Sequence, residues 1–289
     1  MRYGLRGIGQ ARRASFSLSE RAISTEKRKL SITFLVSRTI VQSGVEIIDR
    51  KKIALVTGAN KGIGLEIAKE LGKLGMVVLV GARDEERGQE AVRQLTGMDL
   101  EAVFVQLEVT DEESVKQAAA QIDRTYGRLD VLVNNAGITG TEGGAPSEIS
   151  VESMRAVYET NVFGVVAVTN ALMPLLRKSP AARIVNVSSG LGSITHSSDP
   201  NSELAQYNFM SYQSSKSALN AITVAYAKEF RTTGIKVNAA DPGYTATDLN
   251  QHRGHRTTEQ AAVVIVRLAT LPEDGPSGTF QDENGELPW

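Results

Sequence analysis

The stretch Ile53-Ala-Leu-Val-Thr-Gly-Ala-Asn-Lys-Gly-Ile-Gly64 predicts how the rest of the chain folds. It opens with the apolar run Ile53–Val56, which is typical of a strand buried on both faces. Three glycines follow at G-x-x-x-G-x-G spacing, and a helical pattern begins at Leu65. Glycine permits a left-handed turn, and the free N–H groups at the start of a helix suit a pyrophosphate. The stretch therefore predicts a strand, a phosphate-binding turn and a helix, although a tight turn without a ligand could carry the same glycines.

From Lys51 onward, strand-like and helix-like segments alternate along the chain. The strand-like segments are mostly short, β-branched and uncharged, as parallel strands covered on both faces should be. The alternation predicts an α/β fold, a single doubly wound Rossmann-type parallel sheet of about seven strands with helices on both faces. The predicted strands are Ile53–Val56, Met76–Val80, Ala102–Leu107, Val131–Asn134, Arg183–Val187, Ile235–Ala239 and Thr279–Gln281, and the predicted helices are Leu65–Leu74, Glu85–Leu95, Glu112–Tyr126, Val151–Leu176, Tyr212–Arg231 and Thr258–Leu271.

Charge separates the first 50 residues from the rest of the chain. Residues 1–50 contain ten Lys or Arg and four Asp or Glu, which leaves 22 basic and 29 acidic residues from chain totals of 32 and 33. We predict a basic N-terminal extension over residues 1–50, flexible or weakly ordered, and one domain over residues 51–289. Within the extension, Ser31–Val45 is apolar enough to form a short strand or helix.

The start of the extension bears on localisation. It is rich in Arg, contains Ser and has its first acidic residue at Glu20, a composition that resembles an organellar transit peptide. A flexible tail and a start codon placed too far upstream are the alternatives that we favour. We therefore expect a cytoplasmic protein, with organellar targeting as the alternative.

Composition argues against several classes of site and partner. The absence of cysteine excludes a disulfide framework, a thiolate nucleophile and a Cys-ligated zinc site. The pair His252-x-x-His255 has no acidic cluster beside it, so we predict no metal site. A net charge of −1 gives no reason to expect a nucleic acid or an anionic membrane as partner. We also expect no membrane-spanning helix, because no apolar run reaches about 18 residues.

Ligands of a doubly wound sheet bind at the carboxyl ends of its strands, so the residues that follow each strand are the informative ones. Gly81-Ala82-Arg83-Asp84 follows the second predicted strand and places an Arg where NAD-binding folds usually place an acid. Lys61 in the glycine turn adds a second positive charge, and Asn60 adds a polar contact. This pattern favours a 2′-phosphate, and therefore NADP over NAD, although Arg83 alone could be a solvated residue at a helix start.

Tyr212 and Lys216 lie four residues apart on one face of a predicted helix. A free tyrosine has a pKa near 10, and a nearby ammonium together with a positively charged nicotinamide should lower that pKa toward neutrality. Ser189, which follows the fifth predicted strand, could hydrogen-bond a substrate oxygen. A lone Tyr-x-x-x-Lys pair is common on solvated helix surfaces, so the interpretation depends on its order and spacing relative to the glycine turn.

Several motifs in this order resemble the short-chain dehydrogenase/reductase family over essentially all of residues 51–289. Arg83, Asn60 and Lys61 also resemble the pattern of NADPH-dependent members similar to carbonyl reductases, as does the C-terminal end of the chain. The matching stretches are Thr57-Gly-Ala-Asn-Lys-Gly-Ile-Gly64, Asn134-Asn-Ala-Gly137, Asn161 in Asn-Val-Phe-Gly, Val187-Ser-Ser189, Tyr212–Lys216 and Pro242-Gly243.

The resemblance implies a catalytic tetrad of Asn161, Ser189, Tyr212 and Lys216. Tyr212 would be the acid/base, Lys216 would bind the ribose and lower the tyrosine pKa, Ser189 would position the substrate, and Asn161 would hold a water in a proton relay. Ser189 is chosen over Ser188 because the family's serine is the second of the pair. The cofactor NADP(H) would contact Gly58, Asn60, Lys61, Gly62, Ile63, Gly64, Arg83, Glu108, Val109, Asn135, Ala136, Gly137, Tyr212, Lys216, Pro242, Gly243, Thr245 and Thr247.

Two features depart from the family pattern. Glu108 stands where the family usually has Asp, and it should reach the adenine region less comfortably. The segment between Ser189 and Tyr212 is longer than in common members and lies beside the predicted substrate site. Such an insertion could close the pocket or obstruct a helical dimer face, so a monomer and a homo-oligomer both remain open.

Together these observations predict an NADPH-dependent oxidoreductase that transfers a hydride to a ketone or aldehyde, or from a secondary alcohol. Its partner would be a small-molecule carbonyl or alcohol substrate. Two alternatives are a reductase of 3-oxoacyl thioesters and a regulatory protein that binds NADPH without turnover. A complete tetrad favours an enzyme, because a sensor does not need Tyr212 and Lys216 in register.

Overall fold

The computed structural model describes residues 37–42, 45–140 and 144–289. The chain divides after Lys51 into two units, which are described separately. In the first unit, β1 (Ser37–Gln42) pairs antiparallel with β2 (Val45–Arg50). The described part of the predicted Ser31–Val45 segment is therefore strand, and the expectations for residues 1–36 lie outside the described residues.

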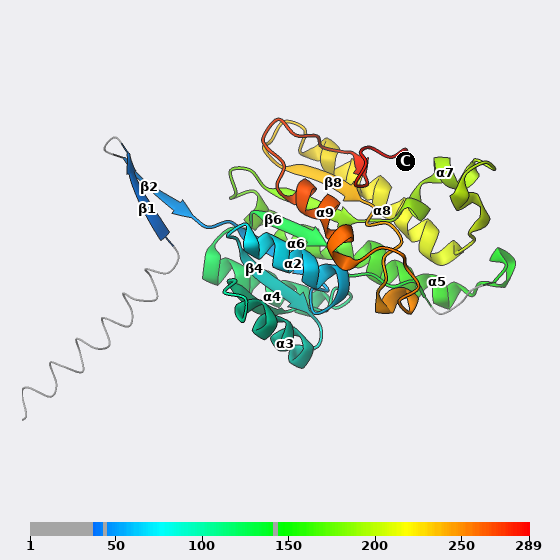
Figure 1. Cartoon of the computed structure of the whole chain (residues 1–289), viewed down its shortest axis with the longest axis horizontal. Coiled ribbons are helices and arrows are strands. Elements are labelled where there is room, and N and C mark those ends of the chain that lie inside the picture. Colours follow the sequence, from blue (N-terminus) through cyan, green and yellow to red (C-terminus); the bar gives the residue numbers. More distant parts are fainter. Residues whose placement is uncertain (1–36, 43–44, 141–143) are drawn as a thin grey trace, which may run out of the picture. The chain divides into compact units, whose positions relative to one another are not determined.

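The second unit is built on a parallel sheet of seven strands, as predicted (Figure 1). The strands lie in the order β5-β4-β3-β6-β7-β8-β9, and each neighbouring pair is parallel. The order reverses between β3 and β6, and this switch point is where doubly wound sheets bind ligands. The strands are β3 (Ile53–Thr57), β4 (Val77–Ala82), β5 (Ala102–Gln106), β6 (Val131–Asn134), β7 (Arg183–Val187), β8 (Lys236–Ala240) and β9 (Phe280–Gln281).

Helices cover both faces of this sheet (Figure 1). Three-residue to five-residue helical turns, named η1 to η5, supplement the longer helices. The turns are η1 (Pro146–Glu148), η2 (Glu159–Phe163), η3 (Gly190–Gly192), η4 (Glu203–Gln206) and η5 (Asp248–Asn250). The helices are α2 (Gly62–Lys73), α3 (Glu85–Thr96), α4 (Glu112–Tyr126), α5 (Val151–Tyr158), α6 (Gly164–Leu176), α7 (Ile194–Ser198), α8 (Met210–Glu229) and α9 (Thr258–Ala269).

The burial of both faces of strand β3 explains why its apolar run is uninterrupted. Ile53 and Leu55 belong to one core, which they share with residues of α4, α6 and α8. Ala54 and Val56 point the other way and belong to a second core with residues of α2, α3 and α9. Successive side chains of a strand alternate between faces, so a strand covered by helices on both sides needs apolar residues at every position.

The predicted helix Val151–Leu176 is one continuous helical run made of α5, η2 and α6. Its middle, Glu159–Phe163, is a π-helical turn, which the sequence did not indicate. Among the described residues, this run is long and apolar enough to cross a membrane by length and composition, but 56% of its apolar window is buried inside the protein. Its apolar character is therefore explained by packing in the core next to α4.

Several predicted boundaries differ from the observed ones near the site. Helix α2 begins at Gly62 rather than Leu65, so two of the glycines lie within its first turn. Strand β4 continues to Ala82 because Ala82 pairs with Gln106 of β5, which places Arg83 directly after the strand. The insertion after Ser189 folds into η3, α7 and η4 before α8 begins at Met210.

Candidate active site

The glycine turn between β3 and α2 is held in place by the turn that follows β6. Gly58 has a φ of +64°, a value that side chains rarely adopt. A Cβ on Gly64 would lie 2.5 Å from Nδ2 of Asn135, so only glycine permits this approach. The Asn135 side chain donates to the carbonyl oxygens of Thr57 and Gly58 at 2.8 and 3.3 Å. Strand ends that are remote in sequence thus form one rigid cradle.

The start of α2 is suited to a phosphate group. Its N-cap, Lys61, makes no side-chain capping bond, and the first turn of α2 contains no acidic residue. By contrast, Asp84, Asp111 and Thr257 cap the N-termini of α3, α4 and α9 with side-chain oxygens. The N–H groups of α2 therefore lack the anionic or hydroxyl acceptor that α3, α4 and α9 carry, and a pyrophosphate would supply it.

Tyr212 and Lys216 lie on the first two turns of α8, near the carboxyl end of β7. The Lys216 ammonium donates to the carbonyl oxygen of Val187 at 2.7 Å and lies 5.5 Å from the centroid of the Tyr212 ring. Tyr212 is hydrogen-bonded to Ser189, whose Oγ also accepts from the Leu191 N–H at 3.3 Å. The predicted serine, tyrosine and lysine are thus brought together at one edge of the sheet.

Asn161 lies in the π-helical turn and is buried, with 1% of its surface exposed. Its Oδ1 accepts from the Ile138 N–H at 2.9 Å, and its Nδ2 donates to the Ile138 carbonyl at 2.8 Å and to Ser215 Oγ at 3.0 Å. A Cβ on Gly137 would lie 3.3 Å from Asn161 Oδ1 and 3.6 Å from Lys216 Nζ. The fourth predicted member therefore lies close to Lys216, on the opposite side of Gly137.

The protonation of this cluster differs from what the sequence predicts. Burial raises the pKa of Tyr212 to about 12; the hydrogen bond to Ser189 opposes this increase, and the charge of Asp241 adds to it. Burial lowers the pKa of Lys216 to about 8, and the charge of Asp241 opposes this decrease. The predicted lowering of the tyrosine pKa is therefore not a property of these side chains by themselves, because desolvation of the phenolate dominates.

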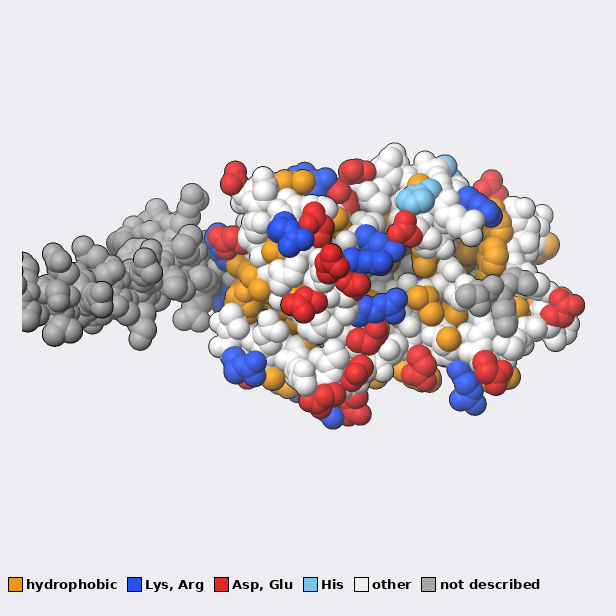
Figure 2. Space-filling model, turned by 90° about the horizontal axis from the view of Figure 1, so that it is seen from below, with side chains coloured by type: hydrophobic (Ala, Val, Ile, Leu, Met, Phe, Trp, Pro, Cys, Tyr) orange, Lys and Arg blue, Asp and Glu red, His pale blue; other side chains and the backbone are white. Residues whose placement is uncertain are grey.

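The two cations predicted to favour a 2′-phosphate lie on the surface beside the glycine turn, and each is near an acid. Arg83 Nη1 is 3.6 Å from Glu108 Oε2, and 77% of the Arg83 side chain is exposed. Lys61 Nζ is 2.5 Å from Asp248 Oδ2, in the loop after β8. Figure 2 shows basic and acidic side chains intermixed on one face of the protein. Both cations can be reached from solvent, but neither is without an acidic neighbour.

The loop after β8 supplies the last group of predicted contacts. Thr245 is buried, and its hydroxyl donates to the carbonyl oxygens of Pro242 and Gly243 at 3.2 and 3.1 Å. Thr247 precedes η5, and its methyl group would lie 3.6 Å from a Cβ on Gly62. Of the remaining predicted contacts, Asn60, Val109 and Ala136 lie in the turns at the ends of β3, β5 and β6, and Ile63 lies in the first turn of α2.

The two histidines considered as a metal pair make other contacts. His252 Nε2 lies 2.9 Å from Asp248 Oδ1, and the His255 ring packs edge-on against Tyr244 with centroids 6.0 Å apart. Among residues 51–140 and 144–289, no group of three or more His, Asp or Glu side chains is arranged to hold a metal ion.

Sequence reasoning missed several residues that hold the site. Thr57 Oγ1 accepts from the backbone N–H groups of Asn135 and Ala136, both at 2.9 Å. Ser215 Oγ accepts a hydrogen bond from Asn161 Nδ2, and Ser215 lies within the Tyr212–Lys216 motif. Threonine at the end of a buried strand was a usable signal, because a buried hydroxyl needs partners. Ser215 offered no such signal, because the helical pattern around it does not show that its hydroxyl is buried.

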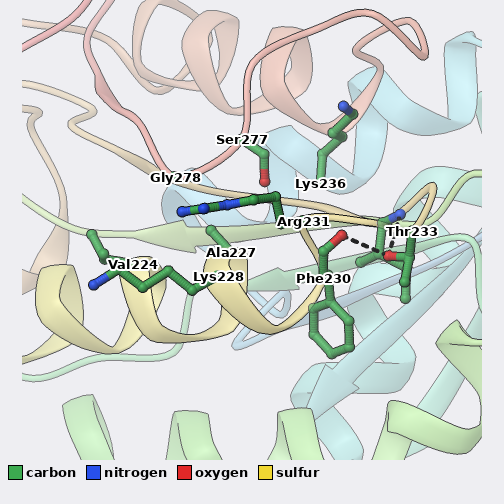
Figure 3. A pocket seen from close by; sticks show the side chains of 10 residues that line it. Val224, Ala227, Lys228, Phe230, Arg231, Thr233, Lys236, Ser277 and Gly278 are labelled. Carbon is green, nitrogen blue, oxygen red and sulfur yellow. Dashed lines mark hydrogen bonds between the residues drawn. The ribbon is translucent and has the colours of Figure 1, made fainter.

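A cavity of about 320 Å³ lies away from this site, between the end of α8 and the loop before β9. Figure 3 shows Lys228 and Lys236 on its rim pointing in different directions, with the Arg231 side chain between them. Its lining includes Ile235 and Lys236, where β8 begins, whereas the tetrad lies near the carboxyl ends of the strands. The cavity is therefore not part of the candidate active site.

Comparison with known protein families gives a single assignment. The family model described as short chain dehydrogenase matches residues 52–258. A short-chain dehydrogenase from Penicillium roqueforti, anuI, is 39% identical over 246 residues, which cover 81% of this chain and 95% of that protein.

Solved structures of reductases have the same fold. The structure of salutaridine reductase from Papaver somniferum is 32% identical, covers 80% of this chain and 99% of its own, and gives a TM-score of 0.70. The structure of an NADPH-bound carbonyl reductase from chicken fatty liver is 31% identical, covers 83% of this chain and 99% of its own, and gives a TM-score of 0.72.

Proposed function

Because the chain belongs to the short-chain dehydrogenase family, we propose that it is an NADPH-dependent oxidoreductase that reduces a ketone or aldehyde, or oxidises a secondary alcohol. The observation that carries the proposal is the convergence of Asn161, Ser189, Tyr212 and Lys216 beside the glycine turn. The similar proteins named as salutaridine reductase and carbonyl reductase support a carbonyl substrate.

The chain's own residues would bind the substrate and move one proton. NADPH supplies the hydride when it is bound. The Ser189 hydroxyl orients the substrate oxygen, and the Tyr212 hydroxyl donates its proton to that oxygen as negative charge develops there. Lys216, held by the Val187 carbonyl, keeps a positive charge beside the phenolate that remains. Asn161, fixed by three hydrogen bonds, would hold a water through which Tyr212 regains a proton.

The preference for NADPH is supported by charge at the end of β4. Ala82 offers no carboxylate to a ribose 2′-hydroxyl, and the exposed Arg83 guanidinium could bind a 2′-phosphate. Lys61 lies in the glycine turn but is paired with Asp248, so a phosphate would have to compete with that carboxylate. Glu108 competes in the same way for Arg83, at the longer distance of 3.6 Å.

The test of function is oxidation of NADPH and NADH against a panel of small carbonyls, with Tyr212→Phe as the decisive variant. We expect turnover with NADPH to fall by about 10²- to 10⁴-fold in Tyr212→Phe while NADPH binding is retained. Tyr226→Phe is a matched control, since Tyr226 lies on the same helix and its hydroxyl bonds Asn170 on the surface at 2.8 Å.

Each alternative gives a different result in this experiment. Activity confined to acyl thioesters would identify a 3-oxoacyl thioester reductase. Tight NADPH binding without turnover on any member of the panel would favour a regulatory NADPH-binding protein. Failure to bind either nucleotide would contradict the proposed function.

The cofactor preference is tested by Arg83→Ala. We expect NADPH affinity to fall by roughly tenfold or more, because a charge-assisted contact to the phosphate is lost, while NADH affinity stays unchanged. Arg87→Ala is the control, because Arg87 is an exposed arginine of α3 that is paired with Asp84, the N-cap of that helix. Equal losses for the two nucleotides would mean that Arg83 does not contact the 2′-phosphate.

A further inference from the structure

Helix α8 carries a stripe of polar side chains where a core helix normally presents apolar ones. Lys216, Asn220 and Thr223 follow one another at i, i+4 and i+7 spacing, so they lie on one face of the helix, and all three are buried. Burying a polar group costs free energy unless it is hydrogen-bonded. The partners of the three side chains therefore explain why the stripe is polar.

Two of these side chains bond the last two residues of β7. Asn186 Nδ2 donates to Thr223 Oγ1 at 2.8 Å, and Lys216 Nζ donates to the Val187 carbonyl at 2.7 Å. The two bonds lie about two helical turns apart on α8 and at adjacent positions on the strand. Together they limit how far α8 can slide or rotate relative to the end of β7.

The third side chain, Asn220, bonds the chain on both sides of Ser189. Ser188 Oγ donates to Asn220 Oδ1 at 2.6 Å, and these two residues are 2% and 3% exposed. Asn220 Nδ2 donates in turn to the Gly192 carbonyl at 3.3 Å. One amide on α8 therefore holds the residue before Ser189 and the turn after it.

The surrounding contacts leave this turn little freedom to move. A Cβ on Gly192 would lie 2.8 Å from the Cβ of Lys216 and 2.9 Å from its carbonyl carbon, so η3 packs directly on α8. Ser217 Oγ donates to the Gly192 carbonyl at 2.9 Å. On the side away from α8, the Ser188 N–H donates to the Ala240 carbonyl of β8 at 2.7 Å.

We propose that Ser188 and Asn220 form a positioning pair that sets the Ser189 hydroxyl relative to the Tyr212 hydroxyl, so that both can reach one substrate oxygen. This inference rests on the proposed reductase function and assigns a role to the first serine of the Ser-Ser pair. Ser189 follows β7 and Tyr212 lies on α8, so their separation depends on how the helix sits against the strand end. A displacement of about 1 Å between reacting groups can cost about a hundredfold in rate.

Thr169 provides a matched control for a bond that only stabilises the fold. Its Oγ1 accepts from Asn134 Nδ2 at 3.1 Å, and Thr169 is fully buried. This bond also joins a strand end to a helix, but the helix is α6, which carries neither Tyr212 nor Lys216. Thr169→Val removes the hydroxyl and keeps the shape of the side chain. It should therefore lower stability without changing the arrangement of the reacting groups.

The kinetic test uses the full-length chain with NADPH and a carbonyl that it reduces. We expect Ser188→Ala to lower kcat by about ten- to a hundredfold, because the serine turn and α8 are no longer held in register. The Kd for NADPH should change by no more than about threefold, since the glycine turn lies on β3 and α2. Thr169→Val should lower the urea midpoint of unfolding and leave kcat unchanged.

The same substitution in the Tyr212→Phe background separates positioning from general damage. Without the Tyr212 hydroxyl there is nothing left for the pair to align, so Ser188→Ala should lower the residual turnover by no more than about twofold.

Asn220→Ala breaks the bond from the other partner and preserves the test if Ser188→Ala does not fold. It should lower kcat at least as much as Ser188→Ala, because it also releases the Gly192 carbonyl. Addition of Ser188→Ala to Asn220→Ala should then have little further effect, since losses at two partners of one bond are not additive.

A second readout needs no turnover. In protein that contains fluorinated tyrosine, nuclear magnetic resonance reports the surroundings of Tyr212, and Tyr212→Phe assigns its signal. We expect Ser188→Ala and Asn220→Ala to shift or broaden this signal, and Thr169→Val to leave it in place.

The proposal is overturned if Ser188→Ala and Asn220→Ala fold and leave both kcat and the Tyr212 signal unchanged, or if Thr169→Val alters them equally. It is also overturned if Ser188→Ala lowers turnover as much in the Tyr212→Phe background as in the unmodified chain. Failure of the proposed function is a separate result, namely absence of turnover by the unmodified chain on every carbonyl tested. The fluorine signal can be read in either case.

Discussion

Lys216 shows how a single residue is made reactive at a cost in stability. It is 4% exposed, and burial lowers its pKa to about 8. Its ammonium is held by the Val187 carbonyl rather than by a carboxylate in direct contact. A cation in such surroundings is partly stripped of water without full compensation. Placing it beside Tyr212 serves the proposed proton transfer and opposes folding.

This cost predicts how stability should depend on pH. Between pH 8 and 10.5, the unfolded chain holds a proton on Lys216 that the folded chain has released, so the contribution of this group to stability increases with pH. The melting temperature of the unmodified chain should therefore rise relative to that of Lys216→Met across this window, by the equivalent of roughly 3 kcal/mol.

Thermal melts of both chains at several pH values measure this difference. Lys228→Met, on the same helix but exposed, is the control and should show little dependence on pH. A difference between the unmodified chain and Lys216→Met that is independent of pH would show that Lys216 is not desolvated in the folded protein.

At the scale of elements, local sequence patterns predicted the first residue of most of the expected helices correctly. The helix predicted to begin at Glu112 does so after Asp111, whose Oδ1 accepts from the N–H groups of Glu113 and Ser114 at 2.8 and 3.1 Å. Helix periodicity also predicted the run Val151–Leu176. Periodicity did not reveal the π-helical turn within it, because one extra residue in a turn hardly changes an apolar pattern.

The cap of α4 gives a prediction about stability alone. Asp111→Ala removes the acceptor of two backbone N–H groups, so we expect the free energy of unfolding to fall by about 1 kcal/mol. Urea denaturation measures this loss, and kcat should be unaffected. Arg124→Ala, an exposed change in the same helix, is the control. An equal effect of the two substitutions would show that the cap contributes nothing specific.

At the scale of the whole molecule, the sheet explains why distant motifs form one site. Strands β3, β6, β7 and β8 are consecutive neighbours, so the residues that follow them meet at one edge. Gly58, Asn135, Ser189 and Asp241 each occupy that position on a different strand. The division after Lys51 coincides with the start of the family match at residue 52.

That coincidence predicts that the second unit can function without the first. Deletion of residues 1–51 should leave kcat unchanged and the melting temperature within about 2 °C of the full chain, because every residue assigned to the site lies after this point. Thermal melts and the carbonyl assay on both chains test this expectation. A large loss of either property would show that the N-terminal unit stabilises the domain.

The sequence by itself determined the fold class and the order of strands and helices, and its resemblance to a known family predicted the tetrad. The fold follows from short-range patterns: apolar runs for strands buried on both faces and glycines where backbones approach closely. Each pattern reflects a requirement that a residue or its near neighbours must satisfy, so it can be read without knowing what lies across the sheet.

Only the tertiary structure decided how these residues are charged and held. The pairing of Lys61 with Asp248 joins residues 187 positions apart, and the bond between Asn161 and Ser215 spans 54. The pKa of Tyr212 depends on burial and on Asp241, which follows strand β8. Desolvation and charge act through space, and the spacing between two residues in the sequence does not reveal their distance until the strand order is known.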